Sequence, residues 1–311
     1  MMSFISGPFM FFPRGRVGTS PRVQRFPLHI YKRKRGAPRE APKNKRYENP
    51  FPPHMSDGFS MDDIVLLVGN SGSFMTKIDG GMFHMRSPRG ALDTGKLLGR
   101  SPGDTVKIGS VEFTLLRPDI LDHLENLDRG AQIILPKDSS RMVLELGLSP
   151  GSRVVEGGAG SGALSMAILN AISPDGELVT YDIRKDHLER TAGNVERAGL
   201  SGIWKGVVGD VCIDVRERGV DAFVVDIPNP ELAVDAAASS LRAGGRFCSY
   251  VPTFNQMERA AGALRRKGFR NVGGFELLER GFSIKEGATR PVTEILAHTG
   301  FIVRARWMGS P

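Results

Sequence analysis

One segment constrains the fold of this 311-residue chain more than any other: an apolar run that leads into a glycine-rich turn and then into a helical stretch. The run is Val154-Val155-Glu156, four glycines fall within residues 157–162, and residues 164–172 read as helix. Glycines permit positive φ angles and a close approach of backbone to ligand, and a helix amino terminus offers free N–H groups. The segment therefore predicts a strand–turn–helix unit that binds a nucleotide-like ligand.

Strands and helices alternate through the C-terminal part of the chain. Strands are expected at 153–156, 178–181, 204–208, 222–226 and 246–251, with a closing pair at 270–278 and 292–306. Apolar residues recur at helical spacing in 185–198 and 254–268. Such βαβ repetition predicts an α/β domain over residues 118–311, built on a parallel sheet with helices on both faces.

Two further regions precede this domain. From Asp62 to about Arg117, short apolar strings alternate with turn signals, which predicts a small β domain over residues 61–117. Residues 1–60 are proline-rich and basic and lack periodicity, which predicts a disordered extension. Three interpretations of the extension stay open: a flexible segment upstream of the true start, an RNA-binding arm, or an organelle presequence.

The basic character of the chain is confined to its beginning. The net charge is +8, but residues 1–54 hold twelve Lys or Arg against two acids, and the other 257 residues hold 30 against 32. Nucleic-acid binding by the rest must therefore be argued from local chemistry. No apolar run approaches the roughly 18 residues of a membrane span. Cys212 and Cys248 lie far apart in apolar runs, which favours buried thiols in an intracellular protein and leaves their pairing open.

The glycine turn alone does not decide between two cofactor classes. Gly158, Gly160 and Ala163 have the spacing of the dinucleotide-binding fingerprint. The carboxylate of Glu156, directly before the turn, would repel a pyrophosphate but would attract a cofactor that carries a sulfonium and an amino group. The residues therefore favour a methyl-donating cofactor over a nicotinamide one.

Three more acids follow successive strands, at the sheet edge where doubly wound folds bind ligands. Asp182 is placed to accept hydrogen bonds from a ribose diol, and Asp210 from an adenine amino group. Asp226 begins the loop Asp-Ile-Pro-Asn-Pro, whose prolines stiffen its path. Held beside the ligand, Asp226 could accept the exocyclic N–H of a substrate adenine and offset the charge that grows on the base.

Together these motifs resemble the tRNA (adenine-N1)-methyltransferase family, which modifies adenine 58 of the T loop. The resemblance covers about residues 62–306 and is carried by the glycine turn, residues 181–187, the Asp226 loop, residues 132–138, and Arg290-Pro291 with residues 298–301. It implies a Rossmann-like class I methyltransferase sheet, parallel with an antiparallel closing strand, behind a small β-barrel-like domain. It also implies a cytoplasmic homotetramer that uses S-adenosyl-L-methionine and tRNA, with adenine 57 as a further target.

The resemblance also assigns roles to residues. Asp226 is the catalytic residue, Asp182 holds the ribose with His187 nearby, and no metal is involved. The implied cofactor-binding residues are Gln132, Glu156, Gly157, Gly158, Gly160, Ser161, Gly162, Ala163, Leu164, Asp182, His187, Asp210 and Asp226.

Two departures from the family pattern affect recognition of the base. The family usually has Tyr or His before Pro-Lys-Asp and often Trp after the second proline of the Asp226 loop, where this chain has Leu135 and Glu231. Aromatic stacking is worth roughly 1 to 3 kcal/mol per base. Alternatives are therefore a methyltransferase for protein carboxylates or tetrapyrroles, a catalytically silent tRNA-binding subunit, and, remotely, a nicotinamide oxidoreductase.

Overall fold

The computed structural model describes residues 58–70, 72–85, 90–128, 130, 133–293 and 297–309. Residues 1–57 and Gln132 lie outside the described residues, so the interpretations of the basic extension and the cofactor role of Gln132 stay predictions. Among the described helices, none combines the length and the apolar character that crossing a bilayer requires.

The first described strands build an antiparallel sheet with its own core. Its order is β2-β1-β6-β5, and β3 and β4 form a separate hairpin. Phe59, Leu67, Phe113 and Leu115 are fully or almost fully buried in a cluster drawn only from residues 59–115. The strands are β1 Ile64–Gly69, β2 Gly72–Lys77, β3 Met82–Met85, β4 Gly90–Asp93, β5 Thr105–Ile108 and β6 Val111–Leu116.

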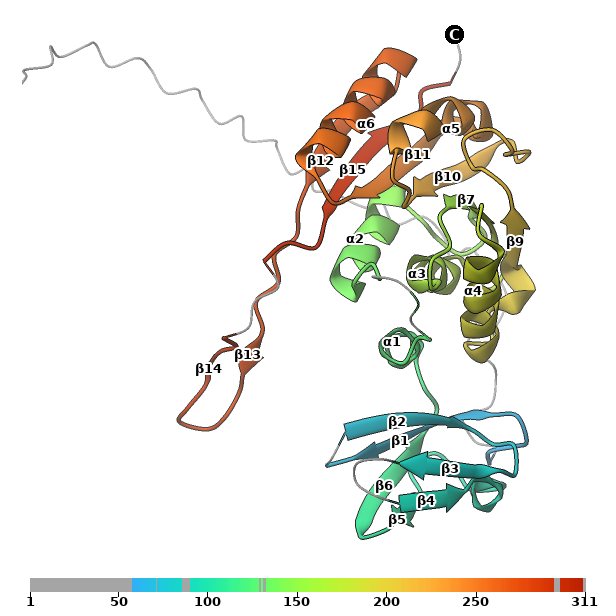
Figure 1. The fold of residues 1–311 in the computed structure, drawn as a ribbon, viewed down its shortest axis with the longest axis vertical. Coiled ribbons are helices and arrows are strands. Elements are labelled where there is room, and N and C mark those ends of the chain that lie inside the picture. The colour runs from blue at the N-terminus through green and yellow to red at the C-terminus, as the bar shows by residue number, and fades with distance from the viewer. Residues whose placement is uncertain are drawn as a thin grey trace, which may run out of the picture. The chain divides into compact units, whose positions relative to one another are not determined.

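A seven-stranded sheet follows, in the order β12-β15-β11-β10-β7-β8-β9 (Figure 1). Neighbours from β11 to β9 are parallel, and β15 runs antiparallel to both β11 and β12. This confirms the predicted α/β sheet with an antiparallel closing strand. The strands are β7 Arg153–Gly157, β8 Glu177–Asp182, β9 Trp204–Val208, β10 Val220–Val225, β11 Leu241–Val251, β12 Arg270–Phe275 and β15 Phe301–Arg306.

Helices cover both faces of this sheet because each presents an apolar stripe to it. Helices α2 to α4 bury Met142, Leu169 and Val195 against one face, and α5 and α6 bury Ala237 and Leu264 against the other (Figure 1). Helix α1 packs on α3. The bounds are α1 Ile120–Glu125, α2 Pro136–Leu146, α3 Ala163–Ile172, α4 Lys185–Arg197, α5 Val234–Ser240 and α6 Phe254–Lys267. The helices predicted at 185–198 and 254–268 agree with α4 and α6 to within one residue.

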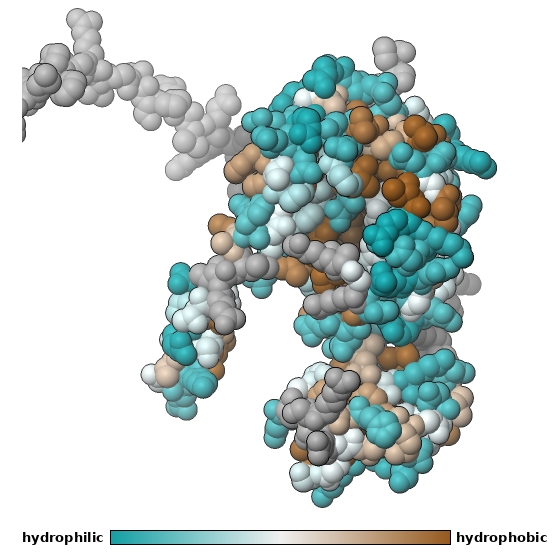
Figure 2. Space-filling model, in the orientation of Figure 1, coloured by the Kyte–Doolittle hydropathy of each residue, from teal (hydrophilic) through white to brown (hydrophobic). Residues whose placement is uncertain are grey.

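The closing strands are shorter than predicted, because the chain leaves the sheet between them. β12 ends at Phe275 and β15 begins at Phe301. Between them a small hairpin pairs β13 Phe282–Ser283 with β14 Arg290–Pro291 and extends away from the sheet (Figure 1). We call residues 278–293 the arm. Figure 2 shows apolar surface on the arm among hydrophilic residues. The exposed fractions are 72% for Leu278 and 82% for Ile284.

Both cysteines are free thiols. Cys248 is buried in β11 and Cys212 is half-buried after β9. Burial raises the pKa of the Cys212 thiol to about 12, and the hydrogen bond and negative charge of Asp210 act in the same direction. Because the thiolate is the reactive form, neither cysteine is expected to act as a nucleophile at neutral pH.

Candidate functional site

The strand–turn–helix unit forms where it was predicted, between β7 and α3. Gly158 has a φ of +93°, and its N–H donates to the carbonyl oxygen of Tyr181 at 2.8 Å. A Cβ atom at position 158 would lie 2.2 Å from the carbonyl oxygen of Asp226, which is far inside van der Waals contact. Only glycine therefore allows the turn to pass this close to the end of β10. This close approach places the predicted cofactor turn beside the Asp226 loop.

Asp182, at the end of β8, is tied to the same turn. Its Oδ2 accepts from the Ala159 N–H at 2.8 Å and lies 3.1 Å from Nδ1 of His187, and its Oδ1 accepts from the Arg184 N–H at 2.8 Å. A carboxylate offers about four acceptor positions. Asp182 thus orders the turn and His187, and it retains acceptor capacity for a ribose hydroxyl.

Glu156 is a carboxylate with no exposed surface. Its Oε2 accepts from the hydroxyls of Ser165 at 2.5 Å and Thr180 at 2.7 Å. Burial raises the pKa of Glu156 to about 7 despite these two hydrogen bonds, and the negative charges of Asp226 and Asp182 add to the shift. Burial and the neighbouring carboxylates thus disfavour the ionised form of Glu156, and a cationic ligand beside it would favour that form.

Two buried polar atoms near the turn have no hydrogen-bond partner among the described residues: Oε1 of Glu156 and Oγ of Ser161. The backbone of Ser161 is held by Asn194, whose amide donates to its carbonyl at 2.8 Å. Buried polar atoms are normally paired. A ligand with an amino group and a carboxylate could serve as donor to Glu156 and acceptor from Ser161, so these residues fit an amino-acid-bearing methyl donor.

Asp226 begins the loop after β10, and its N–H donates to the carbonyl of Gly157 at 2.8 Å. The surrounding protein desolvates the carboxylate and raises its pKa to about 6, although the residue as a whole remains exposed. Asp226 is therefore an ionised carboxylate at neutral pH, and it lies at the end of β10 where water reaches it. Gln256 braces the loop by donating to the carbonyl of Pro228 at 2.9 Å.

Tyr250 is a candidate site residue that the sequence motifs did not reveal. β10 and β11 are parallel, with Val225 opposite Ser249, so Asp226 and Tyr250 are the next pair along the two strands. Burial raises the pKa of Tyr250 well above its ordinary value, and the negative charges of Asp138 and Asp226 contribute. The half-buried Tyr250 is therefore near enough to both acids for their charges to act on its phenol. Its signal in the sequence was an aromatic residue near the end of the strand after the Asp226 loop.

Asp210 lies at the same sheet edge, two residues after β9, but part of its carboxylate is already engaged. Its Oδ1 accepts from the N–H of Cys212 at 2.8 Å, which is the geometry of a turn cap. A contact with a cofactor adenine would have to use the remaining acceptor capacity. Glu231, at the position where the family often has Trp, forms an ion pair with Arg259 at 2.7 Å.

Comparison with known proteins identifies the family. A family model described as the tRNA methyltransferase complex GCD14 subunit matches residues 118–289. The chain belongs to this family. A relative from Methanocaldococcus jannaschii, named tRNA (adenine(57)-N(1)/adenine(58)-N(1))-methyltransferase, is 31% identical over 62% of this chain and 78% of its own length. A Thermus thermophilus relative, named tRNA (adenine(58)-N(1))-methyltransferase, is 29% identical over 75% of this chain and 91% of its own length.

Solved structures agree with this family. A tRNA (m1A58) methyltransferase from Aquifex aeolicus matches with a TM-score of 0.68 and 25% identity, over 81% of this chain and 100% of that one. An S-adenosylmethionine-dependent O-methyltransferase from Thermotoga maritima matches with a TM-score of 0.76 and 26% identity, over 83% and 97%. The predicted class I methyltransferase fold and its S-adenosylmethionine cofactor are thereby confirmed.

The burial of Glu156 leads to a prediction about the stability of the chain. The pKa of Glu156 is about 7 in the folded chain, compared with its ordinary value of 4.5, which we take for the unfolded chain. Folding therefore favours the protonated form, and the stabilisation that this form contributes is lost as the pH rises from about 4.5 through 7. Glu156→Gln avoids the loss. We expect the free energy of unfolding of the variant, relative to wild type, to rise by up to about 3 kcal/mol between pH 5 and pH 8.

Urea unfolding of the cofactor-free protein at both pH values measures this difference. Glu177→Gln is the control, because its side chain is 51% exposed at the start of β8. A Glu156→Gln difference that does not change with pH would show that Glu156 titrates normally in the folded chain.

Proposed function

We propose that this chain is an S-adenosylmethionine-dependent methyltransferase that acts on N1 of adenine in tRNA, at adenine 58 of the T loop, with adenine 57 as a further target. The observation that carries the proposal is the contact between the glycine turn and the Asp226 loop, which sets an ionised carboxylate beside the predicted cofactor turn. Membership of the tRNA methyltransferase family and the names of its relatives support the same acceptor.

We assign the cofactor to the edge formed by β7, β8 and β9. Glu156 and Ser161 would bind the amino-acid portion, with residues 162–164 lining it, and Asp182 and His187 would lie at the ribose. Asp210 would meet the adenine ring of the cofactor through its free acceptor capacity. The fit of the two unpartnered buried atoms supports this assignment.

The chemistry asks little of the protein beyond placement and charge. Bound S-adenosylmethionine supplies a methyl group on a positively charged sulfur. Asp226 accepts the exocyclic N–H of the target adenine, which aims N1 at that methyl group, and its negative charge offsets the positive charge that develops on the base. No proton has to leave N1 first, because its lone pair is available at neutral pH. Tyr250 provides an aromatic ring beside Asp226, where Leu135 and Glu231 provide none.

Transfer of a labelled methyl group from S-adenosylmethionine to an unmodified tRNA transcript tests the proposal. The matched substrate is the same transcript with guanine at position 58, and we expect labelling of the first far above the second. Equal labelling of both transcripts would show that the methylated nucleotide is not the one at position 58. Binding of tRNA with no calorimetric signal for S-adenosylmethionine would indicate a silent subunit.

We further propose two domains, residues 61–117 and 118–311, in a cytoplasmic homotetramer. A separate core within residues 59–115 supports the division, and free thiols suit the cytoplasm. The arm supports oligomerisation, because Phe282 and Ile284 are 55% and 82% exposed on a hairpin that its own chain leaves open. Large exposed apolar side chains of this kind mark interfaces.

The arm makes this assembly testable. Ile284→Lys places a charge in the proposed interface, so we expect light scattering to show a smaller species than the wild-type oligomer. Leu144→Lys is the control, because Leu144 is 69% exposed on α2 and outside the arm. An Ile284→Lys protein with the mass of the wild-type oligomer would remove the arm from the interface.

A further inference from the structure

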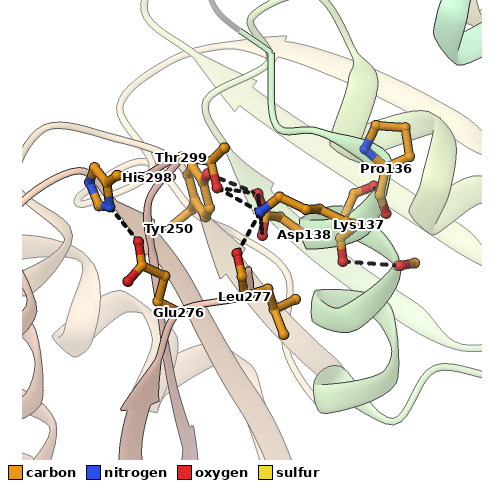
Figure 3. Close-up of polar contacts among 10 residues, drawn as sticks. Pro136, Lys137, Asp138, Tyr250, Glu276, Leu277, His298 and Thr299 are labelled. Atoms are coloured by element: carbon orange, nitrogen blue, oxygen red, sulfur yellow. Dashed lines mark hydrogen bonds and ion pairs between the residues drawn. The ribbon is translucent and has the colours of Figure 1, made fainter. Parts of the chain in front are cut away.

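Two motifs that the proposed chemistry does not use meet in space. Lys137 and Asp138 begin α2, and Thr299 precedes β15, yet the three form one network (Figure 3). Nζ of Lys137 lies 2.8 Å and 3.0 Å from the carboxylate oxygens of Asp138 and donates to Oγ1 of Thr299 at 2.8 Å. The Thr299 hydroxyl in turn donates to Oδ2 of Asp138 at 2.8 Å. We call these three residues the clasp.

Tyr250 is attached to the clasp by its hydroxyl, which donates to Oδ2 of Asp138 at 3.1 Å (Figure 3). Residue 300, directly after Thr299, must be glycine to leave room for the Tyr250 ring, because a Cβ at Gly300 would lie 2.4 Å from a ring atom of Tyr250. The residue pair Asp226 and Tyr250 is thus fixed from two directions, by the strand register on one side and by the clasp on the other.

The clasp also joins the two roots of the arm. Lys137 donates to the carbonyl of Leu277 at 2.9 Å, at the start of the excursion, as well as to Thr299 at its end. A second link is made by His298, whose Nδ1 is 2.7 Å from Glu276 (Figure 3). Its Nε2 is 2.9 Å from the carbonyl oxygen of Pro252. Hydrogen bonds thus connect the residues before the arm with those after it, next to Tyr250.

Stability alone does not explain a charged pair in this place. The side chain of Asp138 has no exposed surface and that of Lys137 is 11% exposed. Buried ion pairs are often no more stabilising than well-packed apolar residues of the same volume, because desolvation offsets their attraction. What a fully satisfied network adds is a single geometry for the groups bonded to it, and here that group is the phenol beside Asp226.

We infer that Asp138 is a positioning residue for methyl transfer, which holds the Tyr250 ring against the target adenine beside Asp226 through the hydrogen bond to the phenol. The inference rests on the proposed function. Asp138 touches neither substrate nor cofactor in this account. Its contribution is the orientation of Tyr250, and Lys137 and Thr299 orient Asp138 in turn.

A double-mutant cycle in single-turnover methyl transfer separates positioning from a general structural role. Tyr250→Phe keeps the ring and deletes the hydrogen bond, and Asp138→Asn keeps the shape and removes the charge. We expect each variant to lower the rate about tenfold, the scale of one such hydrogen bond. The double variant should be no slower than the slower single variant, because Asp138→Asn weakens the same hydrogen bond that Tyr250→Phe deletes. The affinity for S-adenosylmethionine, measured by calorimetry, should be unchanged in all three.

Controls and contrary outcomes are distinct. Ser140→Ala, an exposed position one turn into α2, should match wild type. If the fold-losses in rate of the two single variants multiply in the double variant, Asp138 does not act through Tyr250. A Tyr250→Phe rate equal to wild type would overturn the positioning role as well. In both cases the proposed function stands. Loss of cofactor binding in Asp138→Asn would overturn it in favour of a structural role. A wild-type chain that binds S-adenosylmethionine but methylates no tRNA would overturn the proposed function and this inference together.

Discussion

Replacing Asp226 with alanine is expected to lower the rate of methyl transfer to tRNA by about a hundredfold or more, with the fold and the cofactor affinity largely intact. That is the scale of losing one preorganised electrostatic group. The carboxylate has a pKa of about 6, so it is ionised at neutral pH and its charge is available to the developing cation on the base. Asp226→Asn should be almost as slow, because it keeps a side-chain acceptor but not the charge.

Single-turnover rates together with calorimetric titration of S-adenosylmethionine test this expectation. Asp235→Ala is a suitable control, since that side chain is 81% exposed on α5 and pairs only with Lys267 in the described structure. If Asp226→Ala methylates tRNA as fast as wild type, the carboxylate has no part in the chemistry. If the variant instead loses the cofactor, Asp226 belongs to the cofactor site and not to the acceptor site.

Gly158→Ala is expected to weaken S-adenosylmethionine binding by about a hundredfold. The added Cβ would lie 2.2 Å from the Asp226 carbonyl oxygen, so either the turn or the loop must move, and both line the site. A backbone shift of this kind costs roughly 3 kcal/mol. That energy corresponds to about a hundredfold in affinity if it falls on the bound geometry.

The left-handed backbone of Gly158 calls for a matched control. Gly199 has a similar φ of +70°, but a Cβ added there would meet no neighbouring group within 4 Å, and the residue follows α4 outside the site. Gly199→Ala should cost about 1 to 2 kcal/mol of stability through backbone strain alone and leave cofactor affinity unchanged. Equal losses of affinity in both variants would attribute the effect to strain and not to the contact with Asp226.

The sheet and the cofactor turn were predictable because their signals are local. Strands β7 to β11 are short apolar runs, and the glycine turn and its preceding acid are contiguous in the sequence. Acids that follow parallel strands must meet at one edge, so Asp182 and Asp226 could be placed near the turn before the fold was known. The structure adds that Asp182 accepts a hydrogen bond from the turn itself.

The acceptor side was harder to predict because its contacts are distant in sequence. Tyr250 lies beside Asp226 only through the register of two strands, and Asp138 reaches it across 112 positions. The arm was not predicted for a related reason: residues 276–278 and 292–300 were expected to belong to the two closing strands, but Lys137 binds the carbonyl of Leu277 and the hydroxyl of Thr299 and so holds the two roots of the arm together. Side-chain networks of this kind leave no periodic signal.

Nucleoside mass spectrometry of tRNA, after incubation of an unmodified transcript with the purified chain and S-adenosylmethionine, tests the central claim most directly. We predict N1-methyladenosine as the product, located at position 58 by fragment analysis and nearly absent with the Asp226→Ala variant. A different methylated nucleoside, or an unmodified transcript in the presence of a chain that binds the methyl donor, would contradict the account.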